Sequence, residues 1–288
     1  MVTTIRHYVV FLLARFFRIL SLAIPRRVSK SIMKVLLKTT QYRRATVYGN
    51  LRASFPTLSD DAIATIASQF YEHLTDVTID QLTASGPQRV RIHNKELIDK
   101  LLSQYRHIIV LGSHYGYWET VGKALTPHIP TPHQYVAYRQ IRNPYLNEYV
   151  RELRSDTLAT PIDQKKIYRK ILQHLNSKQP SAYYLIADQY PSSLQNIETT
   201  VFLHQETRWI NSAKRIATKF NLPVVYLQWD GLDNGEHAAT IVPIYDPSRP
   251  TTTSIIASYA KYLQGQIEAD PAKWLWSHKR WKNIRKET

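Results

Sequence analysis

The feature that most constrains the fold is an alternation of short apolar runs with longer helical stretches, beginning at about residue 88. The runs rich in β-branched and aromatic residues are HIIVLGS (107–113), HQYVAY (133–138), SAYYLIA (181–187), LPVVYLQW (222–229) and AATIVPI (238–244). Helices are expected near 117–126, 144–155, 163–177, 209–220 and 253–268, and another after Ser59. This alternation predicts an α/β fold in which helices flank a mixed central sheet.

Positive charge gathers at the two ends of the chain, whose net charge is +16. Residues 1–59 carry 11 Lys or Arg and no acid, and residues 273–288 carry six basic residues and one acid. The long middle, residues 60–272, has 21 basic and 21 acidic side chains. Basic ends on a neutral body indicate an anionic lipid surface or a phosphorylated substrate, and they argue against a nucleic-acid groove.

The segment 8–24 is apolar for 17 residues but contains Arg15 and Arg18. That length is the lower limit for spanning a bilayer, and a central arginine costs about 2.5–3.5 kcal/mol on insertion scales. We expect a helix that lies in the membrane interface, with both arginines reaching lipid phosphates. A signal peptide and an ordinary amphipathic core helix are the alternatives.

A second basic amphipathic stretch runs from residue 28 to about 48, with Lys30, Lys34 and Lys38 on one helical face. Two such helices in series predict a membrane-associating segment over residues 1–56. The α/β domain then spans residues 57–288.

Polar residues follow three of the predicted strands directly. Ser113-His114, Arg139 and Asp188-Gln189 each come after an apolar run. In open α/β sheets the chemistry lies beyond the carboxyl ends of the strands. In LGSHYGYWE (111–119), His114 stands five positions before Glu119. A carboxylate bonded to one imidazole nitrogen would leave the other nitrogen to accept a proton from a hydroxyl. The alternative is a strand-end histidine capped by a nearby acid.

Several kinds of chemistry are disfavoured by what the sequence lacks. The chain has no cysteine, which excludes disulfides, cysteine zinc sites and thiol nucleophiles. It has no G-x-S-x-G elbow, no H-E-x-x-H, no EF-hand and no P-loop, so we predict no acyl-enzyme, no metal and no cofactor. The remaining possibility is a base that activates an acceptor hydroxyl for direct attack on a bound electrophile.

Five stretches resemble, in order, the bacterial lipid A biosynthesis (late) acyltransferases of the lysophospholipid acyltransferase superfamily. They are YRRATVYGNLRASFPTLSDD, the His-x4-Glu stretch GSHYGYWE, AYRQIRNPYLNEYVREL, YYLIADQ and PAKWLWSHKRWK. The resemblance implies a glycerolipid acyltransferase-like fold. It also implies transfer of a fatty acyl group from acyl carrier protein, or less often coenzyme A, to a hydroxyl of a lipid A precursor. Such an enzyme would be peripheral or monotopic on the cytoplasmic face of the bacterial inner membrane.

The resemblance also assigns roles to residues. His114 would be the general base and Glu119 its partner. Residues expected to bind substrate or organise the pocket are Gly116, Arg139, Asn143, Asp188 and Gln189. A buried structural ion pair between Arg139 and Asp188 is the alternative for those two.

The chain departs from the family pattern in two places. Tyr117 replaces the usual Asn inside the motif, and segment 201–215 lacks the usual glycine and is expected to line the acyl or acceptor pocket. Two other functions stay open: transfer to a lysophospholipid, glycolipid or amino-lipid, or non-catalytic binding of membranes or nucleic acid. The C-terminal tryptophans, with Lys279, Arg280 and Lys282, predict either an interfacial anchor or a packed amphipathic helix.

Overall fold

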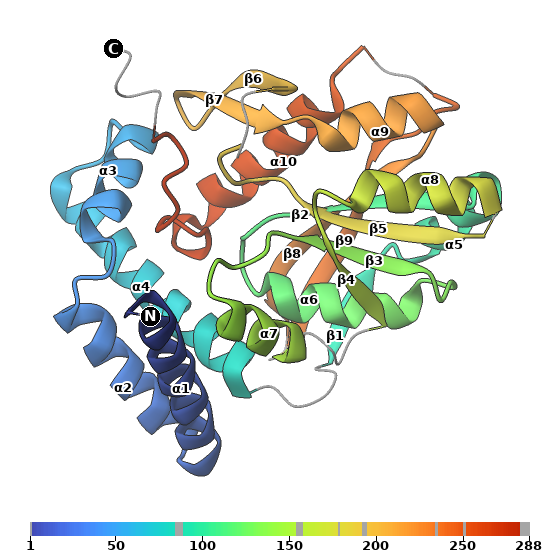
Figure 1. Cartoon of the computed structure of the whole chain (residues 1–288). Helices are drawn as coiled ribbons and strands as arrows, with labels where there is room; N and C mark the ends of the chain where they lie inside the picture. The colour runs from blue at the N-terminus through green and yellow to red at the C-terminus, as the bar shows by residue number, and fades with distance from the viewer. Residues whose placement is uncertain are drawn as a thin grey trace.

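The computed structural model describes residues 2–83, 89–153, 158–177, 179–191, 195–233, 236–249 and 252–282. A seven-stranded sheet, with strand order β1-β9-β8-β2-β5-β3-β4, forms the centre of the molecule (Figure 1). Its strands are β1 (Val90–His93), β2 (His107–Gly112), β3 (Gln134–Tyr138), β4 (Ala159–Asp163), β5 (Ser181–Ile186), β8 (Val224–Asp233) and β9 (Glu236–Tyr245). Only the β8–β9 pair is antiparallel among the described strands of this sheet, which is therefore mixed, as predicted.

Helices cover both faces of the sheet (Figure 1). They are α5 (Glu96–Tyr105), α6 (Trp118–Leu125), α7 (Pro144–Leu153), α8 (Ile167–Ser177), α9 (Ser212–Phe220) and α10 (Ile255–Ala269). Helix α6 packs on β8 and β9 from one face, whereas α9 and α10 pack on β2 and β9 from the other. Strand β2 lies between them, and its residues 107–111 are all buried. Burial on both faces explains why β2 reads as a continuous apolar run and does not alternate.

The five predicted strands are β2, β3, β5, β8 and β9, and the predicted helices correspond to α4 (Asp60–Thr83) and α6–α10. Four strands and one helix were not predicted: β1, β4, the strands β6 (Ile197–Phe202) and β7 (Gln205–Ile210) of a separate hairpin, and α5. Strand β4 contains Pro161, which is tolerated because β4 is at the edge of the sheet. The hairpin turns through Leu203 and His204, both with positive φ, and so lacks the Asn or Gly that marks such turns.

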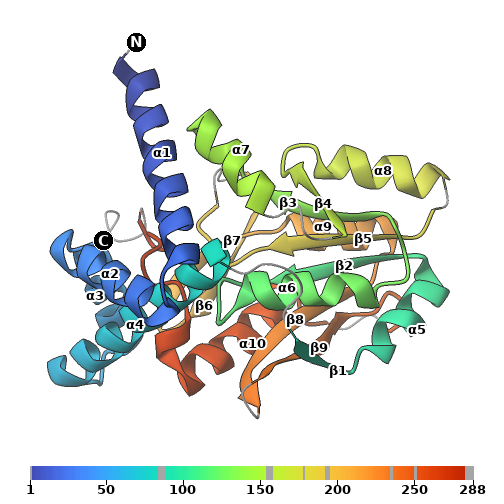
Figure 2. The same ribbon diagram turned by 90° about the horizontal axis from the view of Figure 1, so that it is seen from below.

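Four helices form the N-terminal region: α1 (Val2–Ala23), α2 (Arg26–Thr39), α3 (Arg44–Ser54) and α4. Helices α1, α2 and α4 pack together, and α1 projects from the rest of the molecule (Figure 2). The predicted boundary at residue 56 falls between α3 and α4, which pack against each other. Val47 and Leu51 of α3 are fully buried in the same core as the sheet.

The basic face of α2 contacts the acidic face of α4. Arg26 pairs with Asp80, Lys30 Nζ lies 2.6 Å from Asp76 Oδ1, and Lys34 Nζ lies 3.0 Å from Glu72 Oε1. Helix α4 therefore supplies counterions for Lys30 and Lys34, which the sequence did not indicate, and the membrane-associating role of segment 1–56 stays a prediction.

Arg18 also differs from expectation. Its Nε donates a hydrogen bond to the Leu82 backbone oxygen at 3.2 Å, so this side chain faces the protein and not lipid phosphates.

Pairing of the basic face leaves an apolar face on α1 and α2 exposed. Its large side chains are Ile5, Tyr8, Val9, Val10, Leu12, Leu13, Phe16, Ile19, Leu22, Val28, Val35 and Leu36. Phe16 is 65% exposed and Ile19 is 63% exposed. Nowhere in the described parts of the chain is a helix both long and apolar enough to cross a membrane.

The C-terminal segment 271–282 is a short 3-10 turn (Pro271–Lys273) followed by irregular backbone, not an amphipathic helix. Trp274, Trp276 and Trp281 are nearly inaccessible to solvent, so the interfacial-anchor prediction was wrong for this segment. Asn50 of α3 donates to the backbone oxygens of Trp276 and His278, at 2.9 Å each. The segment is therefore part of the core.

Candidate active site

The register of two neighbouring strands brings His114 and Asp188 together. Strands β2 and β5 are parallel, and Gly112 pairs with Ile186 at the end of both. His114 and Asp188 each lie two positions beyond this pair, at the carboxyl edge of the sheet. This is where parallel sheets place their chemistry, as the sequence pattern predicted.

Asp188 holds both the backbone and the side chain of His114. The His114 Nδ1–H donates to Asp188 Oδ1 at 2.7 Å, and the His114 backbone N–H donates to Oδ2 at 2.8 Å. The indole Nε1–H of Trp274 also donates to Oδ2, at 2.9 Å. Burial alone would raise the pKa of Asp188, but the charge of His114 and these hydrogen bonds lower that pKa to about 2. The carboxylate is therefore ionised at neutral pH.

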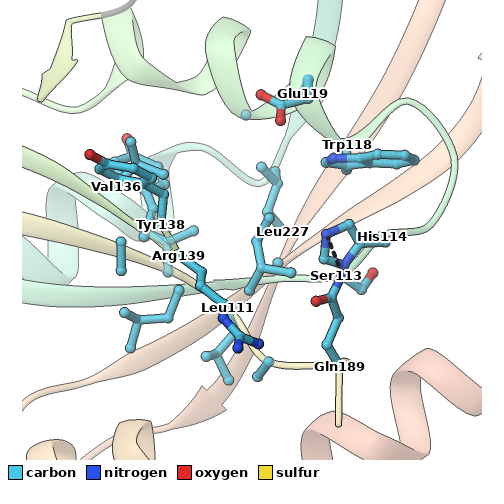
Figure 3. A pocket seen from close by; sticks show the side chains of 18 of the residues that line it. Leu111, Ser113, His114, Trp118, Glu119, Val136, Tyr138, Arg139, Gln189 and Leu227 are labelled. Carbon is cyan, nitrogen blue, oxygen red and sulfur yellow. Dashed lines mark hydrogen bonds between the residues drawn. The ribbon is translucent and has the colours of Figure 1, made fainter. Parts of the chain in front are cut away.

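This pairing fixes the state of the imidazole. Because Nδ1 carries the proton bonded to Asp188, Nε2 of the neutral ring is a proton acceptor. Nε2 lies 3.2 Å from Gln189 Nε2, whose amide can donate to it (Figure 3). The Trp118 ring meets the imidazole edge-on with a centroid distance of 5.3 Å. His114 is thus oriented as a base whose unprotonated nitrogen lies at the cavity and accepts from Gln189.

Ser113, next to His114, is engaged elsewhere. Tyr226 donates its hydroxyl hydrogen to Gln266 Oε1 at 2.5 Å, so the Ser113 hydroxyl, 2.8 Å away, must donate to Tyr226. Ser113 is also buried. These bonds direct its hydroxyl away from the imidazole, which argues against a serine nucleophile.

Glu119 lies in the first turn of α6 and lines the same cavity as His114. In Figure 3 the Glu119 carboxylate lies away from the imidazole, on the other side of the Trp118 ring. The acid on His114 Nδ1 is Asp188, not Glu119 as the sequence spacing suggested. His114 and Glu119 therefore share a cavity without forming the expected hydrogen-bonded pair through that nitrogen.

Gly116 shapes the turn between β2 and α6. Its φ is +61°, and an added Cβ would come within 2.1 Å of the Trp229 ring. Its N–H donates to the Lys273 backbone oxygen at 3.0 Å, and its own oxygen lies 3.2 Å from His73 Nε2. Gly116 does not line the cavity and so supports the site from behind.

Arg139 and Asn143 have different surroundings. Arg139 is exposed, follows β3 directly and reaches into the cavity (Figure 3), so it is not the buried ion-pair partner of Asp188. Asn143 is buried, accepts hydrogen bonds from the first amides of α7 and donates to the His7 backbone oxygen at 2.8 Å. Asn143 caps α7 and ties it to α1, and it is not one of the cavity-lining residues.

The cavity beside His114 has a volume of about 510 Å³ and walls that are largely apolar. Its apolar lining includes Val110, Leu111, Val121, Val136, Val150, Leu185, Ile186, Ile210, Leu227 and Trp229. Within segment 201–215, which was expected to line the pocket, Ile210 is the lining residue. Such a cavity suits an alkyl chain with its reactive end at His114. The described residues include no group of three or more His, Asp or Glu that could hold a metal ion.

Two supports of the site were not predicted from the sequence: Trp274 and the Tyr226–Gln266 pair. Trp274 lies within the PAKWLWSHKRWK stretch, so its match to the family signature was the available signal. Tyr226 lies inside β8, where the apolar sequence predicts burial but does not indicate a role in the site.

A family model described as bacterial lipid A biosynthesis acyltransferase matches residues 2–283. No match is found among curated proteins. The family match covers nearly the whole chain, so the chain belongs to this family of acyltransferases.

Proposed function

We propose that this member of the bacterial lipid A biosynthesis acyltransferase family transfers a fatty acyl chain to a hydroxyl of a lipid A precursor. The donor would be acyl carrier protein, or coenzyme A, carrying the chain as a thioester. The observation that carries the proposal is His114, which has Nδ1 on a buried carboxylate and Nε2 at the edge of an apolar cavity.

The chemistry follows from the tautomer. The acceptor hydroxyl would take the place of the Gln189 amide at Nε2 and lose its proton to that nitrogen as its oxygen attacks the thioester carbonyl carbon. Collapse of the tetrahedral intermediate breaks the C–S bond, and the imidazolium returns the proton to the leaving thiolate. Asp188 stabilises the imidazolium between these two steps. The ester bond forms directly, with no acyl-enzyme.

Three other residues have roles in the proposal. Arg139 would bind a phosphate of the acceptor, since a guanidinium forms two parallel bonds with such a group. Glu119 would act from the α6 side of the cavity, where its carboxylate can accept hydrogen bonds from acceptor hydroxyls. Gln189 holds Nε2 until the acceptor arrives.

We further propose that the enzyme is peripheral or monotopic on the cytoplasmic face of the inner membrane. The exposed apolar face of α1 and α2 would insert among lipids, and the anionic acceptor would enter from that surface. No part of this proposal involves nucleic acid or a cofactor.

Kinetics per folded molecule test the chemistry. His114→Ala should lower kcat by about 10²–10⁴, the usual contribution of a positioned base. Asp188→Asn should lower it by about 10⁴, because the amide no longer fixes the tautomer or stabilises the imidazolium. The double variant should be little worse than His114→Ala alone, because the two residues act as a unit.

Glu119→Gln separates the two carboxylates. A large fall in kcat is expected, but combined with Asp188→Asn its effect should multiply, because Glu119 contacts the acceptor and Asp188 the base. Wild-type turnover in folded His114→Ala would contradict the mechanism.

Mass spectrometry of lipid A from a deletion strain tests the acceptor, and unchanged lipid A with an altered phospholipid or amino-lipid would reassign it.

A further inference from the structure

Five cations lie together where β3 and β4 end, at one side of the cavity. We call them the β3–β4 basic surface: Arg139, Arg142, Lys165, Lys166 and Arg169. All five are exposed. The equal numbers of charges over residues 60–272 conceal this local excess.

The sheet register brings the two loops together. Strands β3 and β4 are parallel, with Tyr138 paired to Asp163, and the Gln164 N–H donates to the Tyr138 oxygen at 2.9 Å. Arg139 and Gln164 therefore lie side by side, and both line the cavity. Lys165 and Lys166 follow at once and lead into α8, whose first turn carries Arg169.

Unlike the basic face of α2, this surface meets no acidic counterion among the residues that the structure describes. On α2, three cations each face an acid of α4. Across the stretches that the structure describes, no ion pair joins any of the five cations to a carboxylate. Clustered like charges repel, so an unneutralised cluster at a cavity mouth favours an anionic partner.

We propose that the β3–β4 basic surface docks an acidic carrier protein that delivers the acyl thioester, an inference that rests on the proposed acyl transfer. The docking cations are Arg142, Lys165, Lys166 and Arg169, while Arg139, which lines the cavity, is left to the acceptor phosphate. The cations spread over two loops and a helix, and none is buried, which fits a protein surface better than a nucleotide phosphate cradle. Helix α7 separates α8 from α1 (Figure 2). The donor would thus approach from the α8 side and the lipid acceptor from the α1 side.

Binding of holo acyl carrier protein, without an acyl chain, tests the surface separately from catalysis. The variant Lys165→Glu/Lys166→Glu/Arg169→Glu should raise the Kd at least tenfold, and the corresponding Gln variant should lie between it and wild type. Wild-type binding should weaken as salt rises, because exposed charges are screened. Lys100→Glu/Lys261→Glu, which reverses exposed lysines on α5 and α10, should bind as wild type does.

An equal Kd for the wild type and the Glu variant, or no measurable wild-type binding, would overturn the proposal. Weaker binding of the Glu variant to anionic vesicles with an unchanged Kd for the carrier would assign the surface to the membrane and also overturn it.

Turnover then identifies the donor. For the Glu variant, the ratio of kcat/KM with acyl carrier protein to kcat/KM with acyl-pantetheine should fall at least tenfold. A matching fall with acyl-coenzyme A alone would assign the surface to nucleotide phosphates and overturn the proposal. Failure of wild-type enzyme to acylate any lipid would refute the proposed function, whereas carrier binding would still report on the surface.

Discussion

The two basic ends of the chain look alike in sequence but have different environments in the structure. Both combine Lys and Arg with large apolar side chains, and both were candidates for membrane contact. At the N-terminus, Leu13, Phe16 and Ile19 are more than half exposed. At the C-terminus, Trp274, Trp276 and Trp281 are buried. The two regions have similar compositions, and their packing partners decide whether the apolar side chains are buried or exposed.

The partners can be named. The C-terminal segment fits against α3, where Asn50 and Arg43 donate to its backbone oxygens. Arg280 of this segment is buried and stacks on the Trp209 ring, with its central carbon 4.4 Å from the ring centroid. Helix α1 packs against α2, α4 and α7, and among the described residues nothing covers its opposite face, which carries Leu13, Phe16 and Ile19.

The largest expected difference between the two ends is in folding stability. Trp276→Ala should lower the free energy of unfolding by about 3–5 kcal/mol, because it leaves a large cavity in a packed core. Phe16→Ala on α1 should change it by less than about 0.5 kcal/mol, since an exposed side chain loses little contact. Denaturant unfolding in detergent measures both. Equal losses would mean that α1 is packed like the C-terminal segment.

Membrane binding should show the reverse difference. Leu13→Ser/Phe16→Ser/Ile19→Ser should lower partition onto lipid vesicles at least 100-fold, because each large apolar side chain contributes about 1.5–3 kcal/mol when buried. High salt should not release the wild-type protein, since apolar insertion is insensitive to screening. Complete release by salt would contradict insertion of α1. Sedimentation with vesicles gives both results.

The sequence predicted the parts of the site that have a local pattern and missed those that depend on distant packing partners. The ends of β2 and β5 could be predicted, because an apolar run stops just before His114 and another just before Asp188. The parallel register of the two strands then makes these residues neighbours. The spacing of His114 and Glu119 within one motif drew attention to the local acid. The acid bonded to Nδ1 comes from another strand, 74 residues away. Long-range pairing of this kind has no local sequence signal.

The lysines of α2 illustrate the same limit. Their helical spacing was visible, but the matching acids on α4 lie about 40 residues later and required the antiparallel packing of the two helices. The edge strand β4 and the glycine-free hairpin were missed because their local patterns are atypical.

The third prediction concerns the stability of the C-terminal segment at low pH. Burial lowers the pKa of His278 to about 4, and its Nδ1 has no hydrogen-bond partner among the described residues. A neutral histidine in the folded state destabilises the fold as pH falls, because the unfolded chain takes up the proton first, from about pH 6.5 down to about pH 4. At about 1.4 kcal/mol per pKa unit, the loss in the free energy of unfolding should be about 3 kcal/mol at most.

His278→Gln should flatten the stability curve over this interval. Unfolding measured at steps from pH 7.5 to pH 4 would show the wild type losing its advantage over the variant as pH falls. Parallel curves for the two proteins would mean that His278 is already solvated in the folded state and that the C-terminal segment is looser than its tryptophans indicate.

The smallest expected effect concerns whether the lysines of α2 pair with acids of α4 or bind lipid phosphates. Lys30 and Lys34 are paired with Asp76 and Glu72, and the side chains involved are 30–61% exposed. Lys30→Gln/Lys34→Gln should therefore lower stability by less than about 1 kcal/mol per pair. Its affinity for anionic vesicles should change less than twofold, because α4 already neutralises both charges. Asp76→Asn/Glu72→Gln is the matched control, and by freeing the lysines it should raise that affinity. A large, salt-dependent loss of vesicle binding in the lysine variant would show that these side chains leave α4 for lipid phosphates.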